Sequence, residues 1–357
     1  MQILGSYFLK KFFTSAGKFE YPFSGKTQNI WSTSTTLKFI SFLLSLLPNK
    51  RKQRDPNVRI WPAKNKNNTP LSENDFPLIF VVHNGRPLLP AFLDHYRTIG
   101  VTRFMCVDDA SKDGTTDYLL KQEDVDVYFS NVRYKAAARS KTWRELLAEK
   151  YGKNRWYLNV DVDEFLFTGY NSNMTISQYA KILYKKGILR LPAPMIDMVP
   201  GRELSEAVLT DDVKPWEISS YFDLDGYHGY SKSGGIKLYG GARKRLWNAD
   251  AELIKYPLIY WDKYTSMGIS VHSPLPAYRN HPPVCGALLH FKIFSDVETV
   301  AKQALKTGQY FEENREYKLM QHYFRTTDTA SKKLVYDRSI KFEGEETLVQ
   351  NGMIRKY

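Results

Sequence analysis

Apolar runs of strand length alternate with helical segments from residue 76 onward. The first run, 77–82, is continuously apolar and leads into a polar loop, and segment 88–99 then repeats apolar positions at helical spacing. The pattern continues in the same way, with expected strands at 77–82, 103–107, 125–129 and 155–160 and expected helices at 88–99, 115–120 and 136–150. This alternation predicts an α/β fold with a doubly wound, mostly parallel sheet, whose ligands bind beyond the carboxyl ends of the strands.

The two ends of the chain differ from this central part. The N-terminal part contains an apolar segment of eleven residues at 37–47, too short for a bilayer core, which takes about 20, and a basic run at 50–54 follows it. Such a segment could lie in the interface of an anionic membrane or pack onto another protein surface. We expect a membrane-associating or packing extension at 1–75, an α/β domain at 76–295 and a C-terminal helical extension at 296–357.

Composition narrows the class of protein. Hydrophobic residues make up 43% of the chain and aromatic residues 14%, which allows a substantial core and excludes a disordered protein. The net charge of +13 attracts anions such as an acidic membrane surface or phosphorylated substrates. No zinc spacing or RNA-binding signature accompanies this charge, so nucleic acid is not an expected partner. Two cysteines and the lack of a clear secretory signal favour a cytoplasmic protein.

The sharpest chemical signal is the sequence NVDVDEF at 159–165, directly after the fourth strand. At strand spacing, Asn159, Asp161 and Asp163 point to one side. Carboxylates held this close repel one another, and a hard divalent cation with oxygen ligands relieves the repulsion. We therefore expect Mn²⁺ or Mg²⁺ at Asp161 and Asp163, where the ion could stabilise a departing diphosphate. The alternative, a solvated acidic turn, is disfavoured by the apolar residues on both sides of the motif.

A second polar cluster, VDDASKDGT at 107–115, follows the second strand. Asp108 and Asp109 could accept hydrogen bonds from a nucleotide base or a ribose hydroxyl. The later part of this cluster could equally form a turn and a helix cap around Asp113. Its position between the first strand and the acidic motif makes the combined pattern more specific than either half.

The segments FVVHNGRPLLPAFLDHYRTIGVTRFMCVDDASKDGT and WYLNVDVDEFLF resemble the family 2-type glycosyltransferases, notably the branch with an Asp-x-Asp-Glu-Phe motif. The resemblance covers roughly residues 77–170, with weaker similarity to about residue 295. It implies a GT-A-like fold, a nucleotide-sugar donor and a divalent metal. By position it implies that Asp109, together with Asp108, binds the base or ribose, that Asp161 faces the ribose and the metal, and that Asp163 is the principal metal ligand.

The resemblance also implies weaker candidates. Relatives often carry Arg-Asn-Glu after the first strand, whereas this chain has His-Asn-Gly, so His83 and Asn84 are expected only to contact the donor. Arg139, on the expected helix before the acidic motif, resembles a donor-side position. His290 resembles a late metal-binding histidine, although a histidine in an apolar run is more often a core residue. Lys292 could offset the charge of a diphosphate or be merely solvated.

An inverting transferase needs a carboxylate that deprotonates the acceptor hydroxyl. Asp223 and Asp225, in the sequence YFDLDGYHGY, are the favoured candidates, although either could belong to a turn before Gly226. Asp262 is a weaker candidate. Glu164 adjoins the metal motif. We expect it to contact the residues that bind the metal, not the metal itself.

These features favour a glycosyltransferase that moves a sugar from a nucleotide-diphosphate donor, a UDP-sugar in first place, to a glycan or lipid-linked acceptor. Bacterial surface polysaccharide assembly, at the inner face of the membrane, is the setting that the resemblance implies. A nucleotidyltransferase or another phosphoryl-transfer enzyme could use the same sheet and carboxylates. A non-catalytic glycan-binding scaffold is the other alternative. The transferred sugar, the acceptor and linkage, the stereochemical course and the oligomeric state stay open at this point.

Overall fold

The structure, a computed structural model, describes residues 17–24, 42, 55–63, 69–170, 173–232, 234–268, 270–327 and 333–356. Apart from Phe42, the apolar segment at 37–47 lies outside these residues, as does the whole basic run at 50–54. Among the helices of the described residues, none is both long enough and apolar enough to cross a bilayer.

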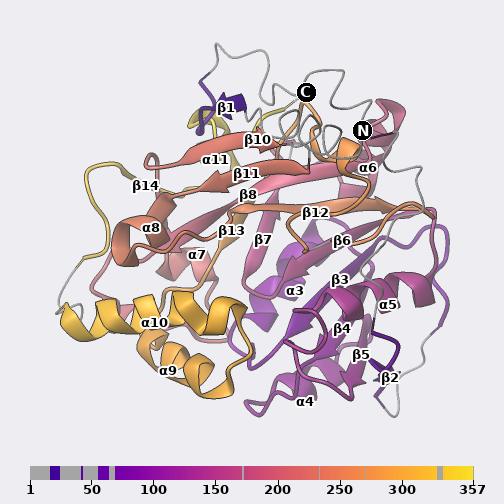
Figure 1. Cartoon of the computed structure of the whole chain (residues 1–357), viewed down its shortest axis with the longest axis horizontal. Helices are drawn as coiled ribbons and strands as arrows, with labels where there is room; N and C mark the ends of the chain where they lie inside the picture. Colours follow the sequence, from indigo (N-terminus) through magenta and orange to yellow (C-terminus); the bar gives the residue numbers. More distant parts are fainter. Residues whose placement is uncertain are drawn as a thin grey trace, which may run out of the picture.

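One large mixed sheet organises this part of the chain (Figure 1). Its strands, in chain order, are β2 (Ile60–Pro62), β3 (Pro77–Val82), β4 (Arg103–Asp108), β5 (Val125–Ser130), β6 (Arg155–Asp161), β7 (Glu164–Phe167), β8 (Arg190–Val199), β9 (Tyr221–Asp223), β12 (Ile254–Trp261), β13 (Ala287–His290) and β14 (Ser339–Lys341). They lie side by side in the order β14-β9-β8-β12-β6-β3-β4-β5-β2, and β13 pairs with β7 and β8. A second, smaller sheet contains β1 (Gly17–Phe19), β10 (His228–Lys232) and β11 (Gly235–Tyr239).

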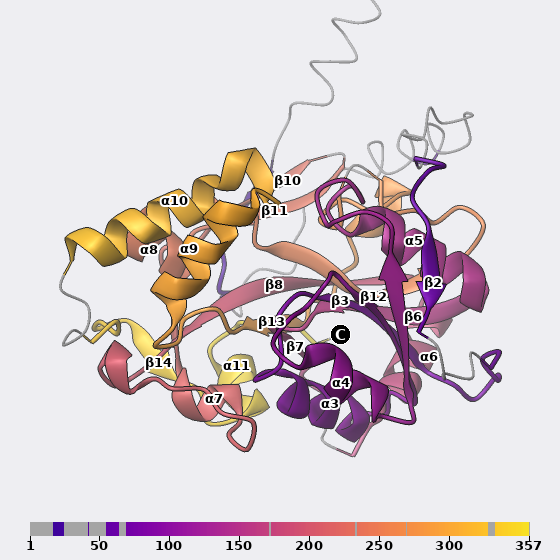
Figure 2. The ribbon, with the colours of Figure 1, turned by 90° about the horizontal axis from the view of Figure 1, so that it is seen from below.

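Helices cover both faces of the large sheet. In Figure 2, α3 and α4 lie on one side of the parallel strands and α5 lies on the other. The described helices are α3 (Leu89–Thr98), α4 (Thr115–Leu120), α5 (Lys141–Tyr151), α6 (Ile176–Lys185), α7 (Pro215–Ile218), α8 (Gly241–Trp247), α9 (Val297–Thr307), α10 (Phe311–Thr326) and α11 (Glu345–Gln350), with short 3-10 turns at Leu204–Glu206 and Ala277–Asn280.

The four strands predicted from apolar runs form a parallel block, so the predicted α/β class is confirmed. Strand β3 pairs in parallel with β4 on one side and β6 on the other, and β4 pairs in parallel with β5. All six residues of β3 are buried, because helices cover both faces of this block. Burial on both faces explains why the run is continuously apolar and does not alternate.

The second half of the sheet is mainly antiparallel. Strand β12 lies between β6 and β8 and is antiparallel to both. Strand β13 is antiparallel to β7 and parallel to β8, and its last residue, His290, therefore lies opposite both Glu164 and Asp197. Residues that are far apart along the chain meet at this point, which becomes the candidate site.

Two expectations about the ends of elements differ from the structure. The helix expected at 136–150 begins only at Lys141, because Ala138, Arg139 and Ser140 have φ values of 50°, 54° and 67°, a left-handed conformation that a right-handed helix cannot contain. The C-terminal region does contain α9 and α10, as its polar, helix-like sequence predicts. It also contributes β14, which pairs with β9, and Arg355, which pairs with Cys285, so it is not purely a helical extension.

Gly85, in the loop after β3, leaves no room for a side chain. A Cβ atom at this buried position would lie 2.6 Å from Val82 Cγ2 and 3.1 Å from Val162 Cγ1. Any side chain here would therefore push the loop away from the acidic motif. The glycine allows the end of β3 to pack directly against the turn that follows β6.

We predict that Gly85→Ala lowers the free energy of unfolding by about 1–3 kcal/mol, because the added methyl group overpacks the contact with both valines. Urea unfolding followed by circular dichroism measures this change. Gly234→Ala is the matched control, since a Cβ there meets no atom within 4 Å. If Gly85→Ala and the control unfold at the same urea concentration, the loop accommodates the methyl group without loss of stability.

Candidate metal and nucleotide site

The polar loops that follow β3, β4 and β6 meet at one edge of the parallel block. Val81 lies opposite Asp161 in the β3–β6 register, and the Asp109 N–H donates to the Val82 carbonyl at 2.8 Å. Asp161 and Asp109 therefore lie on either side of the end of β3, about two strand spacings or roughly 10 Å apart along the hydrogen-bonding direction. The predicted nucleotide and metal motifs are thus neighbours in space.

Asp161 is held by two cations of the protein itself. Lys255 Nζ, from β12, donates to its carboxylate at 2.6 Å, and the Arg144 guanidinium, from α5, makes a second close ion pair. Lys255 also makes a close ion pair with Glu164, whose side chain is almost fully buried. Burial alone would raise the pKa of Asp161, but the charges of Lys255 and Arg144 outweigh burial and hold this pKa well below its usual value.

Asp163 pairs with His290 on the other side of the same turn. His290 Nε2 lies 3.3 Å from Asp163 Oδ2, and His290 Nδ1 lies 2.7 Å from Asp197 Oδ1. Burial lowers the pKa of His290, but the two carboxylates outweigh it and raise the pKa to about 9. Burial likewise opposes ionisation of Asp163, and the charge of His290 lowers its pKa overall.

The group that could hold a metal ion contains Asp163, Glu164 and His290, whose candidate ligand atoms all lie within 4.8 Å of one another. Two carboxylates and an imidazole suit Mn²⁺ better than Mg²⁺, which prefers oxygen ligands alone. Asp197 holds the second nitrogen of His290, as a carboxylate commonly does for a histidine that binds metal. Asp161, expected as a ligand, is not in this group, and its carboxylate pairs with Lys255 and Arg144.

A chain of buried ion pairs continues from His290 towards α10. Arg243 Nε donates to Asp197 at 2.8 Å, and the same guanidinium lies 3.4 Å from Glu316. Lys292 Nζ also donates to Glu316, at 3.1 Å, and lies over the Tyr317 ring. Burial raises the pKa of Glu316, but Lys292 and Arg243 lower it to about 2. Lys292, expected to offset diphosphate charge, is therefore already paired with a carboxylate.

Asp109, directly after β4, is the central residue of the part of the site where the sequence predicts nucleotide binding. Arg133 Nε donates to the Asp109 carboxylate at 2.7 Å, and the Arg133 side chain is 42% exposed. Asp108 is turned inward, where it accepts from the Ser111 N–H at 2.9 Å and from the Thr116 hydroxyl. Asp108 therefore closes a turn, and its expected contact with a base or ribose stays a prediction.

Two residues of the β3 loop link this loop to the one after β4. His83 Nδ1 lies 2.7 Å from the Asp109 carbonyl oxygen, and the Lys112 N–H donates to the Asn84 side chain at 2.8 Å. Asp113 accepts hydrogen bonds from the backbone N–H groups of Arg86 and Thr115, which matches the turn and cap interpretation of this segment. His83 and Asn84 thus shape the nucleotide side of the site.

Within the described residues, the predicted catalytic bases make no hydrogen bond or ion pair with Asp163 or His290. Asp223 is buried, and both its oxygens accept from Arg245, at 2.8 and 3.0 Å. Burial raises its pKa. Asp225 is exposed beyond the end of β9, where it pairs with Arg338 at 3.3 Å. Asp262 pairs with Arg279 beside the end of β12. These carboxylates have structural partners, and their expected role as a base stays a prediction.

Arg139 also differs from its expected place. It is exposed in the left-handed turn that precedes α5 and is not on the helix itself. The functional residues that sequence reasoning missed are the partners of the carboxylates, namely Arg133, Arg144, Asp197, Arg243, Lys255 and Glu316. For Asp197 and Lys255 a signal existed, since each is a charged residue within the apolar run of a buried strand.

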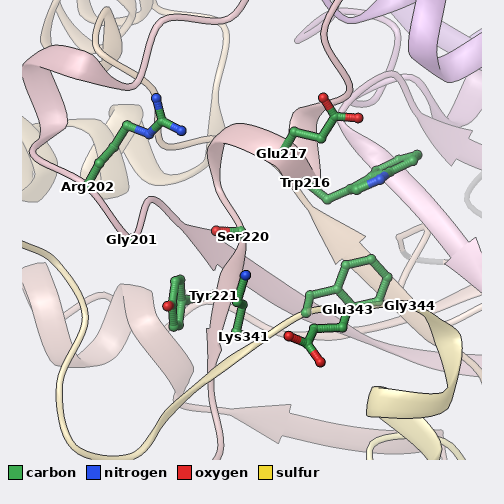
Figure 3. Close-up of a pocket in the computed structure, with 10 residues that line it drawn as sticks. Gly201, Arg202, Trp216, Glu217, Ser220, Tyr221, Lys341, Glu343 and Gly344 are labelled. Atoms are coloured by element: carbon green, nitrogen blue, oxygen red, sulfur yellow. The ribbon is translucent and has the colours of Figure 1, made fainter.

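A surface cavity of about 600 Å³ lies away from this cluster (Figure 3). Trp216, Tyr221 and Lys341 are among the residues that line it. The Trp216 ring packs edge-on against Phe165, at 5.4 Å between centroids. Because Phe165 and Glu164 are consecutive on β7, they point to opposite faces, and the cavity therefore lies on the face opposite to Glu164.

Comparisons with known proteins do not assign a family. No protein-family model and no curated protein matches the chain. A UDP-glucose pyrophosphorylase complexed with UDP-glucose is 8% identical over 78% of this chain and 96% of that chain, with a TM-score of 0.26. The UDP-glucose pyrophosphorylase from Acinetobacter baumanii is 10% identical over 78% of this chain and 92% of that chain, with a TM-score of 0.24. TM-scores this low do not establish a common fold or activity.

We predict that Lys255→Met lowers the free energy of unfolding by about 3–5 kcal/mol at neutral pH, because two buried carboxylates lose their shared cation. Adding Asp161→Asn to this variant should restore part of the loss, since it removes one of the unpaired charges. Urea unfolding measures both effects. Lys302→Met, which removes an exposed pair with Glu298, should change stability by less than about 1 kcal/mol. A similarly small effect of Lys255→Met would contradict the central role of this lysine.

The raised pKa of His290 predicts a pH dependence of stability in EDTA. A group whose folded pKa lies above its unfolded value of roughly 6.5 contributes stability in full below the unfolded value. This contribution should be lost as the pH rises through about 9. The loss, on the order of 3 kcal/mol, should be absent in His290→Gln and unchanged in the exposed control His322→Gln. Equal pH profiles for wild type and His290→Gln would show that His290 is uncharged.

Proposed function

We propose that the chain is a metal-dependent glycosyltransferase that moves a sugar from a nucleotide-diphosphate donor, a UDP-sugar in first place, to a glycan or lipid-linked acceptor. The pairing of Asp163 with His290 carries this proposal, because distant segments bring a carboxylate and an imidazole together at the carboxyl edge of the parallel strands. This edge is where open α/β sheets bind their ligands. Bacterial surface polysaccharide assembly is the setting that the sequence resemblance favours.

The roles of the metal-side residues follow from their contacts. A bound Mn²⁺ would supply positive charge that stabilises the diphosphate as it departs from the sugar. Asp163 and His290 would hold this ion, with Glu164 as a further ligand. Asp197 fixes His290 through Nδ1, which leaves Nε2 directed towards Asp163. Lys255 fixes the turn between β6 and β7 by binding Asp161 and Glu164.

Asp109 and Arg133 are the residues we assign to the nucleotide. Asp109 lies across the end of β3 from Asp161, at roughly 10 Å, which a nucleoside diphosphate is long enough to bridge. Arg133 is half exposed and already oriented by Asp109, so its free donors could bind the base or ribose. His83 keeps the two loops together through its contact with the Asp109 carbonyl.

A nucleotidyltransferase is the nearest alternative, and one observation disfavours it. Such an enzyme usually needs a glycine-rich, basic loop after the first strand to bind a triphosphate. Arg86, the cation of this loop, forms an ion pair with Asp211 at 2.5 Å and lies over the Tyr118 ring. A cation held in this way is poorly placed to bind phosphate, so we favour transfer from a nucleotide sugar.

We expect one nucleotide among UDP, GDP and CDP to bind the purified chain in the presence of Mn²⁺ and to lose binding in EDTA. The reason is that the diphosphate needs the ion held by Asp163 and His290. Asp163→Ala should weaken binding by at least about 100-fold. Isothermal titration calorimetry measures each combination, and circular dichroism checks that the variant is folded.

Asp117→Ala is the matched control, since this exposed aspartate lies on α4 outside the cluster. Equal binding in Mn²⁺ and EDTA would refute the metal-held donor. No binding of any nucleotide by the folded protein would refute the donor site and favour a glycan-binding scaffold. Release of pyrophosphate from UTP and a sugar 1-phosphate would instead favour the nucleotidyltransferase.

A further inference from the structure

Aromatic side chains gather at the edge of the sheet opposite to the carboxylates, where β6 begins and β12 ends. The Tyr260 ring lies 5.7 Å from Trp156 and 5.0 Å from Tyr184, measured between centroids. Tyr184 is 51% exposed, and Tyr264, in the turn after β12, is 47% exposed. Large hydrophobic side chains are rarely this exposed in the described part of the chain, so a cluster of them indicates an interaction surface.

Cations surround these rings. Lys181 and Lys185 are exposed one turn apart on α6, and Lys263, also exposed, lies over the Tyr264 ring at 5.1 Å. Lys153 is exposed in the loop before β6. Within the described residues none of these four lysines has an ion pair. We call these residues the basic-aromatic edge, which comprises Lys153, Trp156, Lys181, Tyr184, Lys185, Tyr260, Lys263 and Tyr264.

Backbone contacts show that these residues share one edge. The Asn154 N–H donates to the Trp261 carbonyl at 2.6 Å, and the Tyr260 N–H donates to the Leu189 carbonyl at 2.9 Å. The starts of β6 and β8 and the end of β12 therefore lie together. The carboxylate at this edge, Asp262, is paired with Arg279 at 2.7 Å, so it does not neutralise the lysines.

A second observation indicates the kind of partner. Phe42, from the apolar segment at 37–47, contacts Tyr278 edge-on at 5.6 Å. Tyr278 adjoins Arg279, the partner of Asp262, so Phe42 lies close to the turn that carries Lys263. One side chain of the most apolar stretch of the sequence, that of Phe42, thus lies near the same edge. Apolar side chains are buried favourably in the interface of a lipid bilayer, whereas the charged backbone of a nucleic acid offers them no such environment.

We propose that the basic-aromatic edge binds the surface of an anionic lipid bilayer. Tyrosine and tryptophan are favoured at the membrane–water interface, and each lysine near an anionic surface contributes about 1 kcal/mol. This inference does not depend on the proposed transferase activity. It also sets the orientation of the molecule, because Trp156 and Asp161 are five residues apart on β6, or roughly 16 Å. The carboxylates then face away from the bilayer, towards acceptors that extend from it.

The test is co-sedimentation of the full chain with vesicles of phosphatidylcholine, with and without phosphatidylglycerol. We expect binding only to vesicles that contain phosphatidylglycerol, and weaker binding as the salt concentration rises. Lys181→Gln combined with Lys185→Gln should lower the partition coefficient about 30-fold, since two cations near the surface are lost. Tyr184→Ser should also weaken binding, although it changes no charge.

Lys306→Gln combined with Lys318→Gln is the matched control, because it removes the same charge from α9 and α10 at the other end of the molecule (Figure 1). Full binding by this control, with loss in the α6 variant, supports the proposal. Equal loss in both double variants, or binding unaffected by the α6 change, overturns it. Binding to RNA in place of vesicles, with the same dependence on Lys181 and Lys185, would also overturn it.

Discussion

The site depends on the ammonium group of Lys255, which lies between the carboxylates of Asp161 and Glu164. Two carboxylates this close repel each other, and burial makes the repulsion stronger because little water screens it. Lys255 comes from β12, so the antiparallel half of the sheet supplies the charge that the acidic motif of the parallel half requires. Lys255 thus adds an electrostatic link to the backbone pairing of β6 with β12 that already joins the two halves.

From this point, charges of opposite sign alternate across the interior. Asp163 faces His290, His290 faces Asp197, and Asp197 faces Arg243. The series ends on α10, where Glu316 pairs with Arg243 and Lys292. A buried network of this kind holds each member in one orientation, because leaving any member unpaired is costly. The C-terminal helices are therefore tied to the candidate site and not simply appended to the domain.

The two edges of the parallel block have opposite chemistry. The carboxyl ends of the strands carry Asp109, Asp161 and Asp163 with their partner cations. The opposite edge carries exposed aromatic rings and lysines, and Asp262 beside them is paired with Arg279. A parallel sheet allows this division, since all its strands present the same end to the same side. If both proposals hold, the enzyme would bind the membrane through one edge and act on its substrates at the other.

The sequence by itself determined the parallel block, because strands buried on both faces must be continuously apolar and the polar residues after them must gather at one edge. It also placed Asp109 and Asp163, which follow such strands directly. Only the tertiary structure decided which cations pair with the carboxylates. Arg144 and Lys255, which bind Asp161, lie 17 and 94 residues from it along the chain. Arg245 likewise binds the carboxylate of Asp223, a candidate base. Such contacts depend on how distant strands and helices align, and a local pattern of polar and apolar residues carries no information about that alignment.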